Sequence, residues 1–269
     1  MTGVSGAFIM GAVGLLLLPL TALVLNTPWS RLGELIADPG FWQALRLSMF
    51  TSAASLILST LFGVPLAWLL ARVDFRGKRL LRACCVLPMV LPPVVGGVGL
   101  LLAFGRRGLI GRPLAEIFGY TIPFSTTAVV LAATFVAMPF LVLTVEAGIR
   151  GVDHRVEEAA ETLGASRWMV LRRVTLPLLR PSLTAGMALA WARALGEFGA
   201  TITFAGNLPG RTQTVPLAVY LQLEGDRDAA ILLSLVLLVV SIAVLVLLRD
   251  RYLGVPNASR SKHATPEVP

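Results

Sequence analysis

Two ionisable residues, Arg193 and Glu197, stand inside a stretch of sequence, residues 181–204, that is otherwise hydrophobic. Their spacing of four residues places both on one face of a helix, where opposite charges can pair and lower the cost of burying either one. An ionisable residue inside a hydrophobic span is a candidate for function, in a path or a gate. A structural ion pair between packed helices is the alternative. Thr201 adds a hydroxyl that could face such a path or bond to its own helix backbone.

A second group of unusual residues lies in the hydrophobic run 83–104, which contains Pro92, Pro93, Gly96 and Gly97. Prolines and glycines kink or break a helix, and a membrane tolerates this only where protein or a cavity satisfies the freed backbone groups. The cluster could line a path through the membrane. It could equally allow helices to pack closely through small residues.

Residues suited to catalysis are sparse. The sequence has no G-x-x-x-x-G-K-[ST] motif, and its only Gly-Lys pair, at 77–78, is followed by arginine, so no phosphate-binding loop is expected. The two histidines, His154 and His263, are too few and too far apart for a Ser/His/Asp set or a metal site. The adjacent Cys84 and Cys85 are not spaced as metal ligands. We therefore expect no catalytic residues, no metal and no bound cofactor. Any process in this protein that requires energy must then draw it from another subunit or from an ion gradient.

The elements that must position these residues are hydrophobic helices. Of the 269 residues, 56% are hydrophobic and only 14% are charged, whereas soluble domains carry about 25% charged residues. A spanning helix needs about 20 apolar residues. The sequence predicts an all-α membrane protein with one domain, residues 1–254, and a disordered tail, residues 255–269. About six spans are expected, at about 7–25, 41–71, 83–104, 124–146, 181–204 and 228–248.

The net charge of +8 comes from basic residues that are distributed unevenly along the chain. Fifteen of the 23 lysines and arginines fall in the segments 72–82 and 150–180 and after residue 248, against six in the alternate loops. Basic loops stay in the cytoplasm, so these segments and both termini are predicted to be cytoplasmic. The positive charge thus indicates orientation in a lipid bilayer, and no nucleic-acid partner is expected.

The longest predicted cytoplasmic loop, residues 150–180, has signals for two short helices. Asp153 is a good N-cap for a helix that runs to about residue 162. Gly164 can end that helix in a left-handed turn, and Ser166 can cap a second helix that runs to about residue 174. Pro177 and Pro181 are expected to stop the second helix before the fifth span begins.

The second of these helices has an apolar face beside a basic one. Val170, Leu171 and Val174 fall on the apolar face, and Arg167, Arg172 and Arg173 surround it. A mixed surface of this kind suits either a protein partner or lipid headgroups.

The same loop resembles the EAA loop of ABC importer permeases. The resemblance is carried by Glu158-Ala159-Ala160, Gly164, Val174 (isoleucine in the family) and Leu176-Pro177. It implies the ABC importer permease fold, with this loop between helices 4 and 5 serving as a coupling helix that docks on an ATP-binding subunit. The implied coupling residues are Glu158, Ala159, Ala160, Gly164, Arg167, Arg173, Leu176 and Pro177. The resemblance also implies a homodimer of this chain with two ATP-binding subunits, which hold ATP and Mg²⁺.

Three further stretches resemble molybdate permeases, namely ARALGEFGAT at 192–201 with AGNLPG at 205–210, TVPLA at 214–218, and LPPVV at 91–95. The resemblance implies import of molybdate, or of tungstate, across a bacterial or archaeal plasma membrane by alternating access, with an external binding protein. Arg193 would then help a dianion to cross, or the Arg193–Glu197 pair would form a gate. Sulfate and thiosulfate permeases share the Gly-Glu-Phe-Gly core and remain an alternative. An ion-gradient carrier, with Glu146 or Glu197 as its buried acid, is a more remote one.

Overall fold

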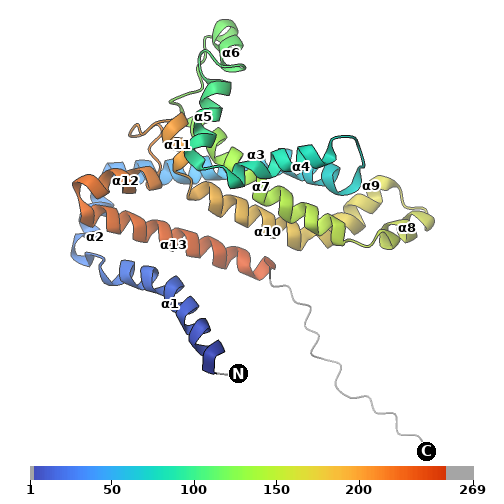
Figure 1. The fold of residues 1–269 in the computed structure, drawn as a ribbon, viewed down its shortest axis with the longest axis horizontal. Helices are drawn as coiled ribbons and strands as arrows, with labels where there is room; N and C mark the ends of the chain where they lie inside the picture. The colour runs from blue at the N-terminus through green and yellow to red at the C-terminus, as the bar shows by residue number, and fades with distance from the viewer. Residues whose placement is uncertain (1–2, 253–269) are drawn as a thin grey trace, which may run out of the picture.

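The computed structural model describes residues 3–252, all of whose regular elements are helical (Figure 1). In this part of the chain four helices are long and apolar enough to cross a membrane. They are α1 (Gly3–Leu25), α3 (Pro39–Arg72), α7 (Thr126–Gly151) and α13 (Arg227–Tyr252). The helices α4 (Lys78–Val90) and α5 (Pro93–Phe104) count as a fifth span if they are taken together. The predicted tail, residues 255–269, lies outside the described residues.

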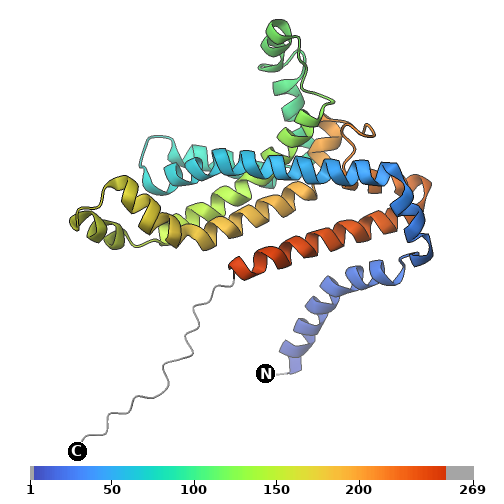
Figure 2. The same cartoon turned by 180° about the vertical axis from the view of Figure 1, so that it is seen from behind.

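The core of the bundle is formed by α3, α7 and α10 (Leu176–Leu195), which run side by side (Figures 1 and 2). Small residues bring these helices together, as expected where lipid removes the usual hydrophobic driving force. A Cβ atom on Gly63 of α3 would lie 2.8 Å from the Leu141 side chain of α7. Trp191 Nε1 of α10 donates a hydrogen bond of 2.9 Å to Ser52 Oγ of α3.

Two of the predicted spans are not single helices. The prolines and glycines of the first predict its break, whereas the break in the second was not expected. The run 83–104 is divided between α4 and α5, and the chain bends by 119° between them. The run 181–204 is divided between α10, which ends at Leu195, and α11 (Gly199–Phe204). Pro92 and Pro93 lack the backbone N–H groups that would continue α4, whereas Pro93 suits the first turn of a new helix. Helix α5 therefore leaves the bundle and carries α6 (Gly111–Phe118) away from it (Figure 1).

The sequence-based expectation that Pro177 and Pro181 would end the second short helix is also wrong. Helix α9 (Arg167–Val170) continues through a π turn, η2 (Leu171–Thr175), directly into α10. Pro177 lies in the first turn of α10, and Pro181 lies within that helix. A π turn widens the helix by one residue, which makes room for a proline ring that would clash with the carbonyl four residues earlier.

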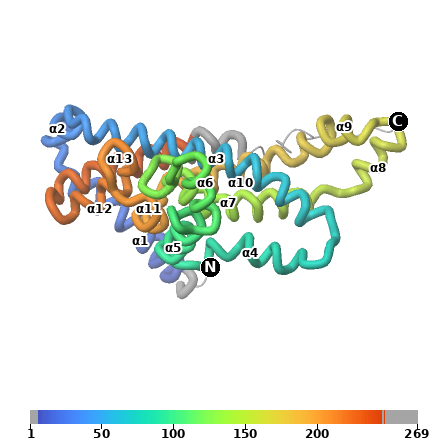
Figure 3. The backbone as a smooth tube through the Cα atoms, turned by 90° about the horizontal axis from the view of Figure 1, so that it is seen from above, coloured from blue at the N-terminus to red at the C-terminus, as the bar shows by residue number. Residues whose placement is uncertain are grey.

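The connections between the helices gather at opposite ends of the bundle. Helices α8 (His154–Thr162) and α9 and the α3–α4 turn lie at one end, and α2 (Leu32–Ala37) and α12 (Val215–Gly225) lie at the other (Figures 1 and 3). At this second end Arg31 Nη2 pairs with Asp226 Oδ2 at 2.7 Å. The Arg31 guanidinium, helped by the Ala229 backbone N–H, lowers the pKa of the Asp226 carboxyl from 3.8 to about 2. The pair joins the segment before α3 to the α12–α13 turn.

Candidate functional site

The helices α8 and α9 form a helix–bend–helix element at the end of the bundle, as the sequence predicts. Asp153 Oδ1 accepts a hydrogen bond of 3.0 Å from the Arg155 backbone N–H at the start of α8. Gly164 has a left-handed φ of +87°, which favours glycine. Ser166 Oγ accepts a hydrogen bond of 3.4 Å from the Met169 backbone N–H and caps α9.

Most of the predicted coupling residues lie together on this element. Glu158, Ala159, Gly164 and Arg167 are exposed on it, and Ala160 is half-buried. Arg173 is exposed in the π turn η2, which follows α9. Leu176 and Pro177 lie apart from them, in the first turn of α10.

The exposed apolar part of the element comes from residues that the sequence did not single out. Leu163 is 90% exposed and Trp168 is 68% exposed, with Met169 beside it. The expected apolar face, which contains Val170, turns toward the bundle, and Val170 is buried. The sequence signal that could have found this surface is a pair of large apolar side chains, one at a turn and one at a helix start. Nothing in the described chain covers them, as is typical of a binding surface.

A polar contact that the sequence did not predict attaches α8 to two helices of the bundle. Glu157 Oε1 accepts a hydrogen bond of 2.6 Å from the Thr175 hydroxyl in η2. Glu157 Oε2 pairs with Arg72 Nη2, at the end of α3, over 3.0 Å. The side chains of Arg72 and Glu157 are only 10% and 16% exposed. Arg72 also lies over the Trp68 ring, 5.6 Å from its centroid, and contacts His154. We name these three residues, Arg72, Glu157 and Thr175, the α8 clasp.

Glu146, a candidate buried acid of the ion-gradient alternative, is only 1% exposed. Its Oε1 accepts a hydrogen bond of 2.9 Å from Arg150 Nη2 and lies 3.1 Å from Arg82 Nη2 of α4. Arg150 also donates to the Leu70 carbonyl oxygen of α3 at 3.1 Å. It is buried because α3 and α4 pack over this face of α7. The carboxylate holds three helices together and its charge is balanced by two arginines.

The predicted pair in the fifth span is present, although the residues are not on one continuous helix. Arg193 Nη2 lies 2.7 Å from Glu197 Oε2, and Glu197 is placed after the end of α10. Glu197 Oε1 accepts a hydrogen bond of 2.8 Å from the Ala200 backbone N–H in the first turn of α11. The carboxylate, 3% exposed, therefore binds both the start of α11 and the arginine.

The proline–glycine cluster lies directly against this break. A Cβ atom on Gly199 would lie 2.7 Å from Pro93 Cβ, and one on Gly97 would lie 2.8 Å from the Ala200 carbonyl oxygen. A Cβ atom on Gly96 would lie 3.0 Å from the Phe135 ring of α7. Close packing by small residues is thus the role that this geometry supports for Gly96 and Gly97.

The remaining predicted residues near this contact differ in their exposure to solvent. Pro92 and Pro93 are exposed at the α4–α5 bend. Thr201 of α11 is buried and 1% exposed, and its neighbour Thr203 donates to the Gly199 carbonyl oxygen at 2.9 Å. The structure therefore brings Pro93, Gly96, Glu197 and Thr201 into one region, at the junction of two broken helices.

This arrangement offers binding surfaces and hinges. Within residues 3–252 no group of three His, Cys, Asp or Glu side chains could hold a metal ion. The exposed α8–α9 element can contact a partner, and the α8 clasp can pass its movement to α3 and α10. The α4–α5 and α10–α11 breaks are the points at which the bundle can bend.

Comparisons with known proteins identify relatives over most of the chain. The chain is 53% identical over 227 residues to "Molybdenum transport system permease protein ModB" of Mycobacterium tuberculosis, with 84% of this chain and 86% of that protein covered. It is 44% identical to the protein of the same name from Escherichia coli, with 82% and 96% covered. "Sulfate transport system permease protein CysT" of Escherichia coli is 37% identical, with 86% and 84% covered.

The fold also matches solved structures. A bacterial ABC transporter involved in the import of the acidic polysaccharide alginate superposes with a TM-score of 0.73 at 17% identity, covering 93% of this chain and 94% of that one. The family described as "Binding-protein-dependent transport system inner membrane component" matches residues 63–254. The chain therefore belongs to this family of inner-membrane transport components.

Proposed function

We propose that this chain is the permease subunit of an ATP-driven importer that moves molybdate, or tungstate, into the cell. Identity to molybdenum permeases of 53% and 44% over more than four-fifths of the chain carries the proposal. Identity to the sulfate permease is lower, at 37%. We propose a homodimer of this chain, two ATP-binding subunits at the α8–α9 end and an external binding protein at the opposite end. ATP and Mg²⁺ belong to the ATP-binding subunits.

The α8–α9 element is the proposed docking point for the ATP-binding subunit. Leu163 and Trp168 supply apolar contacts, and Glu158, Arg167 and Arg173 supply charges around them. When the ATP-binding subunits close, they would move this element. The α8 clasp would then draw the ends of α3 and α10 with it, because Glu157 contacts both Arg72 and Thr175.

The α10–α11 break is the proposed gate. Glu197 neutralises Arg193 and caps α11, so in this conformation the guanidinium is already engaged by an internal carboxylate. Rotation of α11 against α5 would change that contact and open a path for the anion. Replacement Arg193→Ala should reduce uptake in reconstituted vesicles and leave assembly intact. Loss of assembly would instead make the pair purely structural.

The experiment that tests the substrate is ATP hydrolysis by the reconstituted complex with each loaded binding protein. Molybdate-loaded protein should stimulate hydrolysis more strongly than sulfate-loaded protein. The reverse order would move the assignment to a sulfate permease. The ion-gradient alternative has little support from the geometry, because Glu146 and Glu197 are both paired with arginines.

A further inference from the structure

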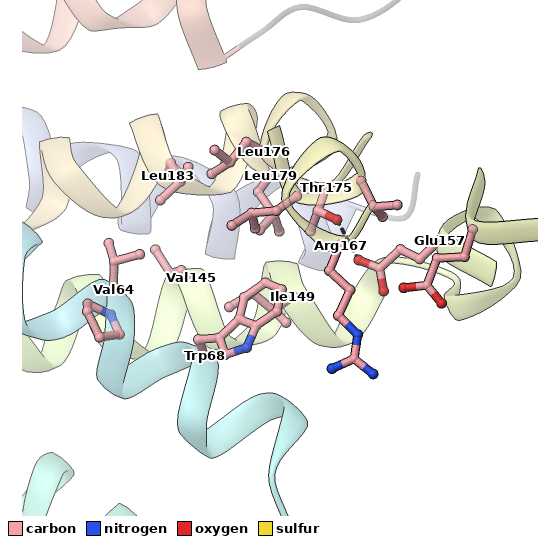
Figure 4. A pocket seen from close by; sticks show the side chains of 14 residues that line it. Val64, Trp68, Val145, Ile149, Glu157, Arg167, Thr175, Leu176, Leu179 and Leu183 are labelled. Carbon is pink, nitrogen blue, oxygen red and sulfur yellow. Dashed lines mark hydrogen bonds between the residues drawn. The ribbon is translucent and has the colours of Figure 1, made fainter. Parts of the chain in front are cut away.

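A groove of about 610 Å³ lies between the α8–α9 element and the bundle (Figure 4). It is bounded by α3, α7, α10 and the two short helices. Its walls are mainly aliphatic and aromatic side chains, among them Val64, Trp68, Val145, Ile149, Leu179 and Leu183. Its mouth carries Glu157, Glu161 and Arg167. The groove is separate from the α10–α11 break, and it adjoins the exposed docking face around Leu163, with which it shares Arg167.

The groove is at the depth of the lipid headgroups in the predicted orientation. Trp68 lies one turn before the end of α3 at Arg72, and tryptophan concentrates where a membrane meets water. Positive loops place this end of the bundle on the cytoplasmic side. Lipids of the inner leaflet can therefore reach the groove from the side.

The charges at the mouth are not equally engaged. Glu157 is already bound to Arg72 and Thr175. Arg167 and Glu161 make no side-chain ion pair or hydrogen bond with other described residues. Figure 4 shows the Arg167 guanidinium on the same side of the groove as the Trp68 ring. A free cation and a free carboxylate thus stand at the entrance to an apolar pocket, and a ligand that matches them needs an anionic group, a cationic group and an apolar body.

The size of the groove separates lipid from protein occupants. A volume of about 610 Å³ lies within the range of roughly 300–1,000 Å³ that holds a small ligand. An α-helix is about 10 Å across with its side chains and rises about 5.4 Å per turn. A helix from a second copy or a partner would therefore fit by little more than one turn.

We propose that the groove binds one phospholipid of the inner leaflet whose headgroup carries both a phosphate and a primary ammonium group, as in phosphatidylethanolamine. An acyl chain packs between Trp68, Ile149, Leu179 and Leu183. The phosphate binds the Arg167 guanidinium, and the ammonium group donates to the Glu161 carboxylate. The lipid fills the space beneath the α8–α9 element, so it supports the contact through which that element is attached to α3 and α10.

The test is native mass spectrometry of the full chain, purified in mild detergent and exposed to equal amounts of phosphatidylethanolamine, phosphatidylglycerol and phosphatidylcholine. One phosphatidylethanolamine adduct is expected per chain. Phosphatidylglycerol lacks the ammonium group, and the quaternary ammonium of phosphatidylcholine cannot donate to Glu161. Equal retention of all three lipids, or no retained lipid, would overturn the proposal.

Two pairs of matched variants locate the adduct. Leu183→Trp fills the groove and should abolish the adduct, whereas Leu178→Trp, on an exposed position of the same helix, should not. Arg167→Gln should lower retention about ten-fold, the cost of one charge-assisted hydrogen bond, and Arg173→Gln, outside the groove, should not. If Leu183→Trp fails to fold, the comparison of Arg167→Gln with Arg173→Gln still tests the site. Unchanged retention in Arg167→Gln would contradict the assigned site.

A second measurement uses the Trp68 ring itself. Phosphatidylethanolamine with brominated acyl chains, added at low mole fraction to phosphatidylcholine nanodiscs, should quench part of the tryptophan fluorescence, and Trp68→Phe should remove that part. Quenching that Trp68→Phe leaves unchanged would place the lipid elsewhere. A protein fragment or a second copy bound at the groove in place of lipid would also refute the proposal.

Discussion

Replacement Glu157→Gln tests whether the α8 clasp holds the α8–α9 element to the bundle. Glutamine keeps an oxygen for the Thr175 hydroxyl but cannot balance the charge of Arg72, whose side chain is 10% exposed. Breaking a fully buried ion pair costs about 3–5 kcal/mol. The pair here is partly exposed, and Arg72 keeps its contact with the Trp68 ring, so we expect about 2 kcal/mol. That loss multiplies the detached population of α8 about 30-fold.

The assay combines hydrogen exchange with transport. Amides of α8 should exchange about 30-fold faster in Glu157→Gln, because local opening is that much more frequent. In proteoliposomes with the ATP-binding subunits and the loaded binding protein, anions imported per ATP hydrolysed should fall several-fold while assembly is retained.

A neighbouring ion pair supplies the control. Asp74→Asn breaks the pair with Lys78 in the α3–α4 turn, where Asp74 is 98% exposed, and it should leave both readouts unchanged because such surface pairs contribute about 0–1 kcal/mol. If Glu157→Gln also leaves the exchange rate and the transport ratio unchanged, the clasp does not hold α8. Exchange of the charges, Arg72→Glu with Glu157→Arg, should recover part of the loss.

Three other substitutions address the remaining features. Gly97→Ala should force α5 and α11 apart and lower stability by about 1–3 kcal/mol, because its Cβ would lie 2.8 Å from a backbone oxygen; thermal unfolding in detergent measures this, and Gly99→Ala, with open space around it, should be neutral. The depressed pKa of Asp226 means that its stabilising charge is complete above pH 3.8 and is lost as the pH falls through about 2. The difference in melting temperature between the wild type and Asp226→Asn should therefore shrink between these pH values, and a constant difference would contradict the assignment. Trp168→Ala should weaken co-purification of the ATP-binding subunit, whereas Trp29→Ala at the opposite end should not. Equal yields of that subunit with the two variants would show that Trp168 is not part of the docking surface.

Local signals were predictable from the sequence, and contacts between distant segments were not. Asp153, Gly164 and Ser166 act on the backbone within three residues, so their capping and turn roles follow from residue type alone. The burial and ion pairing of Glu146 and Glu157 depend on arginines from other helices, which no local pattern reveals. The break at Pro92 and Pro93 follows from residue type. The break after Leu195 does not, because it depends on Glu197, whose carboxylate accepts from the Ala200 backbone N–H at the start of α11.

The π turn at Leu171–Thr175 joins α9 to α10 without a break and sets the direction in which the α8–α9 element faces relative to α10. Each residue in an α-helix turns the chain by about 100°. The π turn absorbs one extra residue, so a one-residue deletion there should restore regular helix and leave the α8–α9 element facing nearly the same way. A one-residue deletion from the regular turns of α10 should instead rotate that element by about 100° relative to the rest of α10. Its docking face would then point away from the partner even though every docking residue is still present. The length of the helical path from α9 into α10 therefore matters for docking as much as the side chains that the α8–α9 element presents.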